Sequence, residues 1–380
     1  MPYVEDPPAA PVPPEDHPPG ESTLALLRRH SGAAVGIAVV LAATVGGFAY
    51  VGGFLTPDRL GADKIANALE ATGGGAHAGF RRAHAKGICI AGTFTGTAAA
   101  ARGLSSAGVF DGRPVPVTGR FAEATPDPYA KDPMVGVRSM ALRLQPVGGD
   151  EWRMAINDTP GLHVSTPEAF YENALASVPD PKTGKPDPAK VAAYLAKHPE
   201  SAAFLARMKA KPLASGFAND SYNSIDGFLF VAPDGTQRLV RWTMQAEAPF
   251  ATLTPAARAG RSANYMFEDL LARATTGPLK WRLVATLAQP GDPNRAAEVW
   301  PADRPKVDLG ELVIDHVESE AMGNCRDINF DPLVLPAGML PSDDPIPFAR
   351  SAVYATSFRR RTREHTPPSA VANQSAGTRP

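Results

Sequence analysis

The chain has 380 residues, enough for one large domain or two ordinary ones with a sizeable core. Its formal net charge of -1 gives no overall electrostatic reason to expect a nucleic-acid partner, although local arginine clusters remain possible. Two cysteines exclude a disulfide scaffold, and 39 prolines with 34 glycines predict many turns and irregular connections.

The N-terminal region divides into a polar tail and an apolar segment. Residues 1–30 begin with a proline-rich, acidic stretch that cannot bury a core, and we expect a disordered tail there. The uncharged segment 31–57 has an apolar part of about 20 residues, enough at roughly 1.5 Å per residue to cross a hydrocarbon core of about 30 Å. We interpret it as a transmembrane or signal-anchor segment.

Two alternatives remain for this segment, a cleaved signal peptide and a buried core helix. Arg28 and Arg29 directly precede it and favour a cytoplasmic N-terminus. The expectation is therefore a single-pass anchor in the inner membrane with an exported, periplasmic domain, which could also be released to the periplasm.

The rest of the chain predicts one folded domain over 58–366 and a flexible C-terminal tail over 367–380. Short β-like runs begin near Ile88 and lie at 114–121, 137–144, 151–156, 227–232, 237–244 and 280–287. Helical patterns lie at 60–72, 167–177, 187–209 and 254–274. Many strands at short spacing, with helices inserted late, predict an α+β fold built on an antiparallel β-barrel.

Two of the three segments that carry candidate chemistry are individually weak signals. The segment "RRAHAKG" at 81–87 places His84 before a β-like run, where a lone histidine is more often structural than catalytic. The segment "INDTP" at 156–160 contains Asn157, and Asn and Asp before a proline are ordinary turn residues.

The third segment, "RSAVY" at 350–354, lies in a basic stretch that extends over 349–364. If this stretch is helical, Arg350, Tyr354 and Arg361 fall on one face. A basic surface helix is the alternative.

Taken together and in this order, the three segments resemble the haem catalase superfamily and, within it, the shorter catalase-related peroxidases. "RRAHAKG" resembles the signature around the distal histidine, "INDTP" the distal asparagine motif, and "RSAVY" the motif of the proximal tyrosine. The resemblance covers about residues 59–363. It implies a catalase-like antiparallel barrel with inserted and C-terminal helices, and haem b buried between the barrel and a proximal helix.

The resemblance also implies roles for individual residues. Tyr354 would ligate the haem iron, and Arg350, one helical turn earlier, would favour its ionised form, since an unperturbed tyrosine has a pKa near 10. His84 would transfer the protons of the peroxide and Asn157 would hydrogen-bond it. The remaining implied haem contacts are Arg81, Arg120 and Arg361 at the propionates and Phe170 on the distal face.

Several positions depart from the catalase pattern. Ala122 stands where catalases place a serine whose hydroxyl supports the distal histidine, so we expect one orienting hydrogen bond to be lost. Leu162 and His163 replace two aromatic residues, which predicts a more open or more polar distal pocket. The chain ends soon after Tyr354, so we expect a monomer or small homo-oligomer.

The implied function is a haem-dependent peroxidase. It would reduce hydrogen peroxide or organic hydroperoxides through a ferryl intermediate, use an external small-molecule or protein electron donor, and have weak catalase activity. The alternatives are a true catalase and a non-catalytic haem-binding or haem-sensing membrane protein.

If the domain is exported, Cys89 and Cys325 lie in an oxidising compartment and could form a disulfide between the first barrel strand and the proximal side. Two buried free thiols are the alternative.

Overall fold

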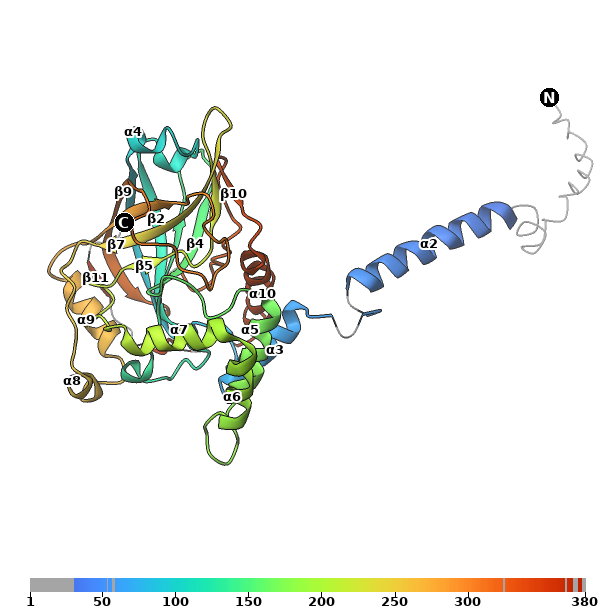
Figure 1. The fold of residues 1–380 in the computed structure, drawn as a ribbon, viewed down its shortest axis with the longest axis horizontal. Coiled ribbons are helices and arrows are strands. Elements are labelled where there is room, and N and C mark those ends of the chain that lie inside the picture. Colours follow the sequence, from blue (N-terminus) through green and yellow to red (C-terminus); the bar gives the residue numbers. More distant parts are fainter. Residues whose placement is uncertain are drawn as a thin grey trace, which may run out of the picture. The chain divides into compact units, whose positions relative to one another are not determined.

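The computed structural model describes residues 31–52, 54–56, 59–323, 325–365 and 368–371, and the backbone of 375–377 (Figure 1). It contains two compact units, Met1–Arg59 and Leu60–Pro380. In the first unit, α2 (Ser31–Val51) is a helix of 21 residues that is long and apolar enough to cross a membrane. The tail expected over 1–30 lies outside the described residues.

The second unit is built on a closed antiparallel β-barrel. Its strands, in the order in which neighbours pair, are β1 (Gly87–Gly96), β2 (Pro114–Glu123), β3 (Arg138–Leu144), β4 (Trp152–Asn157), β5 (Tyr222–Asn223), β7 (Gln237–Ala246), β8 (Leu279–Leu287) and β9 (Lys306–Ser319). The barrel closes because β9 also pairs with β1. The predicted α+β fold with an antiparallel barrel is therefore confirmed.

Three further strands extend the sheet. β6 (Phe228–Val231) pairs with β7, β10 (Met339–Pro341) pairs with β6, and β11 (Ser375–Gly377) pairs with β9. The last of these lies in the segment expected to be a flexible tail, of which the structure otherwise describes residues 368–371. Flexibility of the remainder stays a prediction.

Successive residues of each strand point alternately into the barrel and outward, so the strands form both a core and an outer surface. Trp152, Met154 and Ile156 of β4 belong to the apolar core inside the barrel, where they pack with aromatic residues of other strands. The alternate residues Ala155 and Asn157 therefore project from the outer face of β4. The interior of the barrel is filled by side chains, so a ligand has room only outside it.

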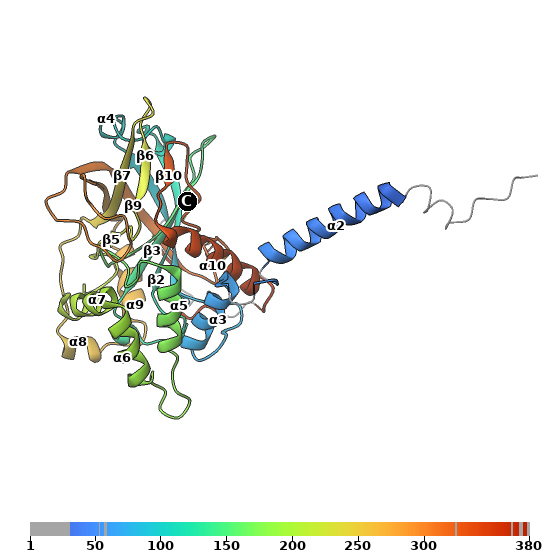
Figure 2. The ribbon, with the colours of Figure 1, turned by 45° about the vertical axis from the view of Figure 1, so that its right-hand side comes forward.

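Helices cover the outer face of β2 to β4 and fill the long connections (Figure 2). They are α3 (Ala62–Thr72), α4 (Ala98–Ala101), α5 (Pro167–Ala176), α6 (Pro188–Lys197), α7 (Pro199–Ala210), α8 (Pro255–Ala259), α9 (Tyr265–Ala274) and α10 (Pro345–Arg361), with 3-10 turns at Gly108–Phe110 and Asp132–Met134. α3 packs against both α5 and α10. Asp344 caps α10 by accepting a hydrogen bond from the amide of Ile346 at 3.0 Å.

The sequence-based elements differ from the structure in three places. The helix expected over 254–274 is divided into α8 and α9, and α8 ends just before Gly260. The helix expected over 187–209 is broken between α6 and α7 because Pro199 cannot continue a helix and instead begins the next one. The strand β9, which closes the barrel, has no counterpart among the expected runs. Its alternation is interrupted by acidic residues and by Gly310, whose φ of +146° accompanies an irregularity of its pairing with β8.

A disulfide joins Cys89 of β1 to Cys325, which lies 236 residues later, and the two Cα atoms are 5.3 Å apart. Both residues are buried, and they pack against Phe330. The disulfide hypothesis is therefore confirmed, and the alternative of two free thiols is wrong. The cross-link ties the segment after β9 to the first strand of the barrel.

Replacing both cysteines, Cys89→Ala with Cys325→Ala, is expected to lower the free energy of unfolding by about 2–4 kcal/mol, because the cross-link restricts the unfolded chain. Urea denaturation followed by tryptophan fluorescence measures the loss. A reductant should shift the wild-type midpoint in the same direction and leave that of the double variant unchanged. Two alkylatable thiols in the non-reduced wild-type protein would contradict the disulfide.

Candidate functional site

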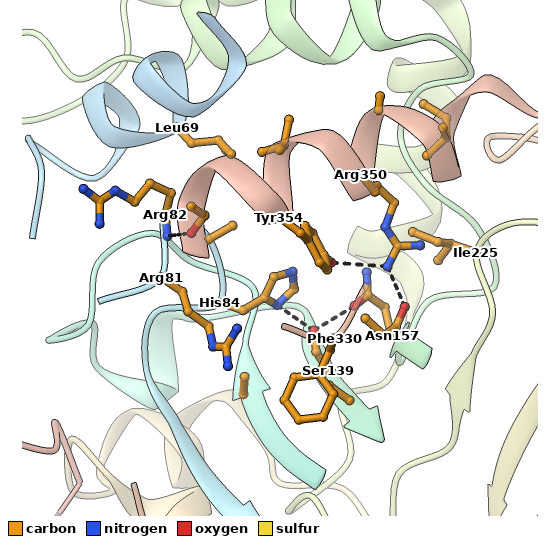
Figure 3. Close-up of a pocket in the computed structure, with 18 of the residues that line it drawn as sticks. Leu69, Arg81, Arg82, His84, Ser139, Asn157, Ile225, Phe330, Arg350 and Tyr354 are labelled. Atoms are coloured by element: carbon orange, nitrogen blue, oxygen red, sulfur yellow. Dashed lines mark hydrogen bonds between the residues drawn. The ribbon is translucent and has the colours of Figure 1, made fainter. Parts of the chain in front are cut away.

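A cavity of about 160 Å³ lies between the outer face of β2 to β4 and helix α10 (Figure 3). Seven of the eight residues expected to form the site line it: Arg81, His84, Arg120, Asn157, Phe170, Arg350 and Tyr354. The eighth, Arg361, lines a small neighbouring pocket together with Arg81. Residues far apart in the sequence, such as His84 and Tyr354 at a separation of 270 positions, therefore meet at one place.

Two rungs of the β-ladder explain why there is room for a cavity. On the first rung, Ala122 pairs with Ser139 and Ser139 pairs with Asn157; on the second, Arg120 pairs with Ala141 and Ala141 with Ala155. All six residues line the cavity. Most of them are small, so the sheet presents a shallow apolar floor with polar groups at its edges.

His84 lies in the turn before β1 and has an unusual backbone. Its φ of +52° makes it the one non-glycine residue in the left-handed region within the described part of the chain. Such a conformation costs a residue with a Cβ atom roughly 1–2 kcal/mol. Strain of this kind persists where surrounding contacts fix the backbone, and it is concentrated at functional sites.

Ser139 links His84 to Asn157. The Ser139 hydroxyl lies 2.8 Å from Nδ1 of His84 and donates a hydrogen bond to Oδ1 of Asn157 at 2.7 Å (Figure 3). The expectation that Ala122 costs the histidine an orienting hydrogen bond is therefore wrong. The hydroxyl is supplied from the opposite position on the neighbouring strand, which the sequence motif around 122 could not indicate.

The imidazole of His84 is held in its neutral form. Burial lowers its pKa, and the guanidiniums of Arg120, Arg350 and Arg81 lower it further, to about 3. A neutral ring near pH 7 can accept a proton, so the site contains a base rather than a fixed cation.

Across the cavity, Arg350 is shared between Tyr354 and a carboxylate that the sequence did not indicate. Its guanidinium donates to the Tyr354 hydroxyl at 3.3 Å and to the carbonyl oxygen of Ala155 at 2.6 Å, and it forms an ion pair with Asp226. Burial alone would lower the pKa of Arg350, but Tyr354 and Asp226 raise it above its usual value. Asp226 precedes β6 in a segment with no recognisable motif, and its importance follows from the fold alone.

Three guanidiniums gather beside the cavity. Arg81 donates to the carbonyl oxygens of Arg326 at 3.1 Å and Ile328 at 2.8 Å, and Arg361 donates to that of Arg326 at 2.6 Å. Burial lowers the pKa of Arg81 well below its usual value, and Arg361 and Arg120 lower it further. The three guanidiniums are therefore bound mainly by neutral carbonyl oxygens rather than by an equal number of buried carboxylates.

The counter-charge beside these arginines is limited. In the part of the chain that the structure describes, Glu320 is the buried carboxylate that pairs with them, through Arg120. Asp327 lies near Arg361, but 77% of its side chain is exposed. Nε of Arg361 is buried and has no hydrogen-bond partner.

A steric contact explains why the motif at 81–87 ends in a glycine, Gly87. A Cβ atom at this position would lie 2.3 Å from the guanidinium of Arg120, which also donates to the carbonyl oxygen of Ala85 at 3.1 Å. Glycine is therefore required for Arg120 to lie across the start of β1.

Leu162 and His163, the two residues that replace aromatic residues of the catalase pattern, lie in different surroundings. Leu162 lines the cavity, whereas His163 does not; its Nε2 atom lies 3.0 Å from Nδ2 of Asn173, and its ring packs near Phe170 with centroids 5.6 Å apart. Leu162 therefore adds no polarity to the cavity.

Comparisons with known proteins show which family, proteins and structures this chain is similar to. The family model of catalase matches residues 78–368. A catalase-related peroxidase of Synechococcus elongatus is 38% identical over 332 residues, which cover 87% of this chain and 94% of that protein. A catalase-related peroxidase of Mycolicibacterium paratuberculosis is 30% identical and the match covers 82% of this chain and 96% of that protein.

Among solved structures, a bacterial catalase matches with a TM-score of 0.65 and 20% identity over 74% of this chain. The match covers 57% of that catalase, so this chain spans little more than half the length of the solved relative.

The pKa of His84 predicts an acid-dependent stability of the haem-free chain. An unfolded histidine takes up a proton near pH 6.5, whereas folded His84 stays neutral down to about pH 3. Between these two pH values the unfolded chain therefore binds more protons than the folded chain, so the free energy of unfolding falls as the pH is lowered. The contribution of His84 to this free energy is complete above about pH 6.5 and is lost as the pH falls toward 3. Relative to His84→Gln, the wild type should lose at most about 1.4 kcal/mol per pH unit between about pH 6 and 4.

Urea titrations of both proteins at several pH values measure this difference. His163, whose pKa burial lowers to about 4, is present in both proteins and cancels. A difference that does not change with pH would show that His84 titrates normally in the folded chain.

Proposed function

The chain belongs to the catalase family, and on this premise we propose that it is a haem-dependent peroxidase. It reduces hydrogen peroxide or organic hydroperoxides with an external electron donor and has at most weak catalase activity. The observation that carries the proposal is one cavity with a neutral histidine on one wall and an arginine-bound tyrosine on another. The names of the two similar catalase-related peroxidases support peroxidase rather than catalase activity.

The residues present fit the haem that the family implies. Arg81, Arg120 and Arg361 have one buried counter-ion, Glu320, and Arg361 also pairs with the exposed Asp327 at 3.3 Å, so net positive charge remains beside the cavity, which suits the propionates of haem b. We propose that Arg81, Arg120 and Arg361 hold these propionates and that Phe170 packs on the haem face. Tyr354 would ligate the iron, as tyrosine does in catalase.

Arg350 donates a hydrogen bond to the Tyr354 oxygen at 3.3 Å, and its positive charge would offset negative charge on that oxygen when it ligates the iron. Asp226 binds the other side of the same guanidinium and fixes its orientation. When bound, the haem would supply the two electrons that reduce the peroxide as its oxygen–oxygen bond breaks.

On the distal side, the neutral imidazole of His84 would accept a proton from one oxygen of the peroxide and deliver it to the other oxygen. That oxygen leaves as water from hydrogen peroxide or as an alcohol from an organic hydroperoxide. His84 therefore begins and ends neutral. Asn157 donates a hydrogen bond to the peroxide without competing for its proton.

Two observations support a membrane-anchored, exported protein. α2 is apolar over its 21 residues, and the disulfide is of a kind that persists in oxidising compartments. We propose a single-pass anchor in the inner membrane with a periplasmic catalytic domain, which could be released by cleavage. A monomeric or small homo-oligomeric state remains a prediction.

Stopped-flow spectroscopy with hydrogen peroxide and with cumene hydroperoxide tests the activity. We expect His84→Ala to slow the reaction of the haem with peroxide by about 10²- to 10⁴-fold, because the general base is lost. Tyr354→Phe should alter the haem spectrum. A full rate in His84→Ala would contradict the mechanism.

Two further results of the same experiment separate the alternatives. Rapid oxygen evolution without a donor would indicate a true catalase, and a haem band with no peroxide consumption would indicate a haem-binding or sensing protein.

Replacing Val39 and Leu41 by arginine should abolish membrane attachment, because each arginine at the centre of a span costs about 2.5–3.5 kcal/mol. Carbonate extraction of membranes, followed by immunodetection, measures the change, with Lys190→Ala and Lys209→Ala in the second unit as a control that should stay attached. A wild-type chain recovered in soluble form and lacking α2 would indicate a cleaved signal instead.

A further inference from the structure

We infer that Ser139 is the positioning residue that fixes the proton on Nδ1 of His84 and turns the amide N–H groups of Asn157 toward the peroxide. The inference deepens the proposed peroxidase function and rests on it. It concerns a residue that the sequence motifs do not contain, and it follows from a count of the protons available in two short contacts.

The first contact places the proton of the Ser139 hydroxyl. A serine hydroxyl has one proton and two lone pairs, and an amide oxygen has lone pairs alone. The two oxygens of Ser139 and Asn157 lie 2.7 Å apart, a distance that requires a proton between them. The hydroxyl of Ser139 therefore donates to Oδ1 of Asn157.

The second contact then places the proton of the histidine. Nδ1 of His84 lies 2.8 Å from the same hydroxyl, whose own proton is already engaged. The hydrogen bond must therefore be donated by the ring, from Nδ1–H to Oγ. A neutral imidazole carries one N–H, so Nε2 is left with a free lone pair.

This assignment gives both distal residues the orientation that peroxide chemistry needs. The free Nε2 atom is the one that can accept a proton; in Figure 3 the second ring nitrogen is turned away from Ser139. Because Oδ1 of Asn157 is bound to Ser139, its NH₂ group remains as the donor on the cavity side. One hydroxyl thus orients a base and a donor together.

The register of the barrel makes the arrangement rigid. Ser139 pairs directly with Asn157 on one side and with Ala122 on the other, so the three side chains share one rung and one face. Directly opposed residues have Cβ atoms about 4.5–5.5 Å apart, which brings a serine hydroxyl within reach of an asparagine amide. Ser139 is itself buried, with 6% of its surface exposed.

The test combines kinetics with a direct measurement of the tautomer. In Ser139→Ala we expect the rate constant for reaction with hydrogen peroxide to fall by about 10- to 100-fold. Nuclear magnetic resonance of the full chain, labelled with ¹⁵N-histidine and loaded with diamagnetic zinc protoporphyrin, distinguishes protonated from unprotonated ring nitrogens. His84→Gln assigns the signals. We expect Nδ1–H in the wild type and loss of this preference in Ser139→Ala.

Three further variants separate positioning from general stability. Ser105→Ala removes another buried hydroxyl, one that donates to the carbonyl oxygen of Gly338 at 2.8 Å, and should change neither the tautomer nor the rate. Ser139→Thr keeps a hydroxyl and should retain Nδ1–H. Ser139→Ala combined with Ala122→Ser returns a hydroxyl from the opposed position and should recover part of the rate.

Two results would overturn the inference. One is Nε2–H in the wild-type protein, and the other is a Ser139→Ala variant that keeps both the wild-type tautomer and the wild-type rate. If the wild type does not react with peroxide at all, the proposed function fails, while the ¹⁵N measurement still decides the role of Ser139 at His84.

Discussion

The site depends on one electrostatic constraint: it contains more buried positive charge than buried negative charge. Arg81, Arg120 and Arg361 are matched by one buried carboxylate, Glu320, among the described residues. Leaving charges buried and unpaired costs several kcal/mol each, so this arrangement is stable only with help. Backbone carbonyl oxygens of the 325–328 segment provide part of that help, and the disulfide at Cys325 fixes this segment to β1. A dianionic ligand edge would provide the rest.

The antiparallel ladder determines which side chains can cooperate. Strand pairing places residues 122, 139 and 157 on one rung and 120, 141 and 155 on the next, all on the outer face. A polar side chain on one strand can therefore be exchanged for one on its neighbour without moving the group that it binds. The replacement of a hydroxyl at Ala122 by the hydroxyl of Ser139 is an instance of this geometric equivalence.

The sequence predicted the parts of the site that lie in contiguous motifs. His84, Asn157 and Tyr354 were singled out because three short motifs, in order, resemble those of the haem catalases, although each motif alone was a weak signal. The barrel was expected from repeated short strands. Ser139, Asp226 and Glu320 were missed because each acts across strands or between distant segments. Their positions depend on register and closure, and β9, which closes the barrel, was itself hidden by its acidic residues.

The basic residues around His84 show how a strained residue is held in place. Arg82 turns away from the site and pairs with Glu70 of α3 and with Glu364 beyond α10, while its amide donates to Ser357. Lys86 is buried on the other side of the turn; it pairs with Asp132 and donates to two backbone carbonyl oxygens. Because both flanks are bound by groups far away in the sequence, the turn cannot relax, and His84 keeps a left-handed backbone that would be unfavourable in an isolated peptide. The cations therefore differ in their surroundings, since Arg81 lines the cavity while Arg82 and Lys86 hold the turn that carries His84 beside Ser139.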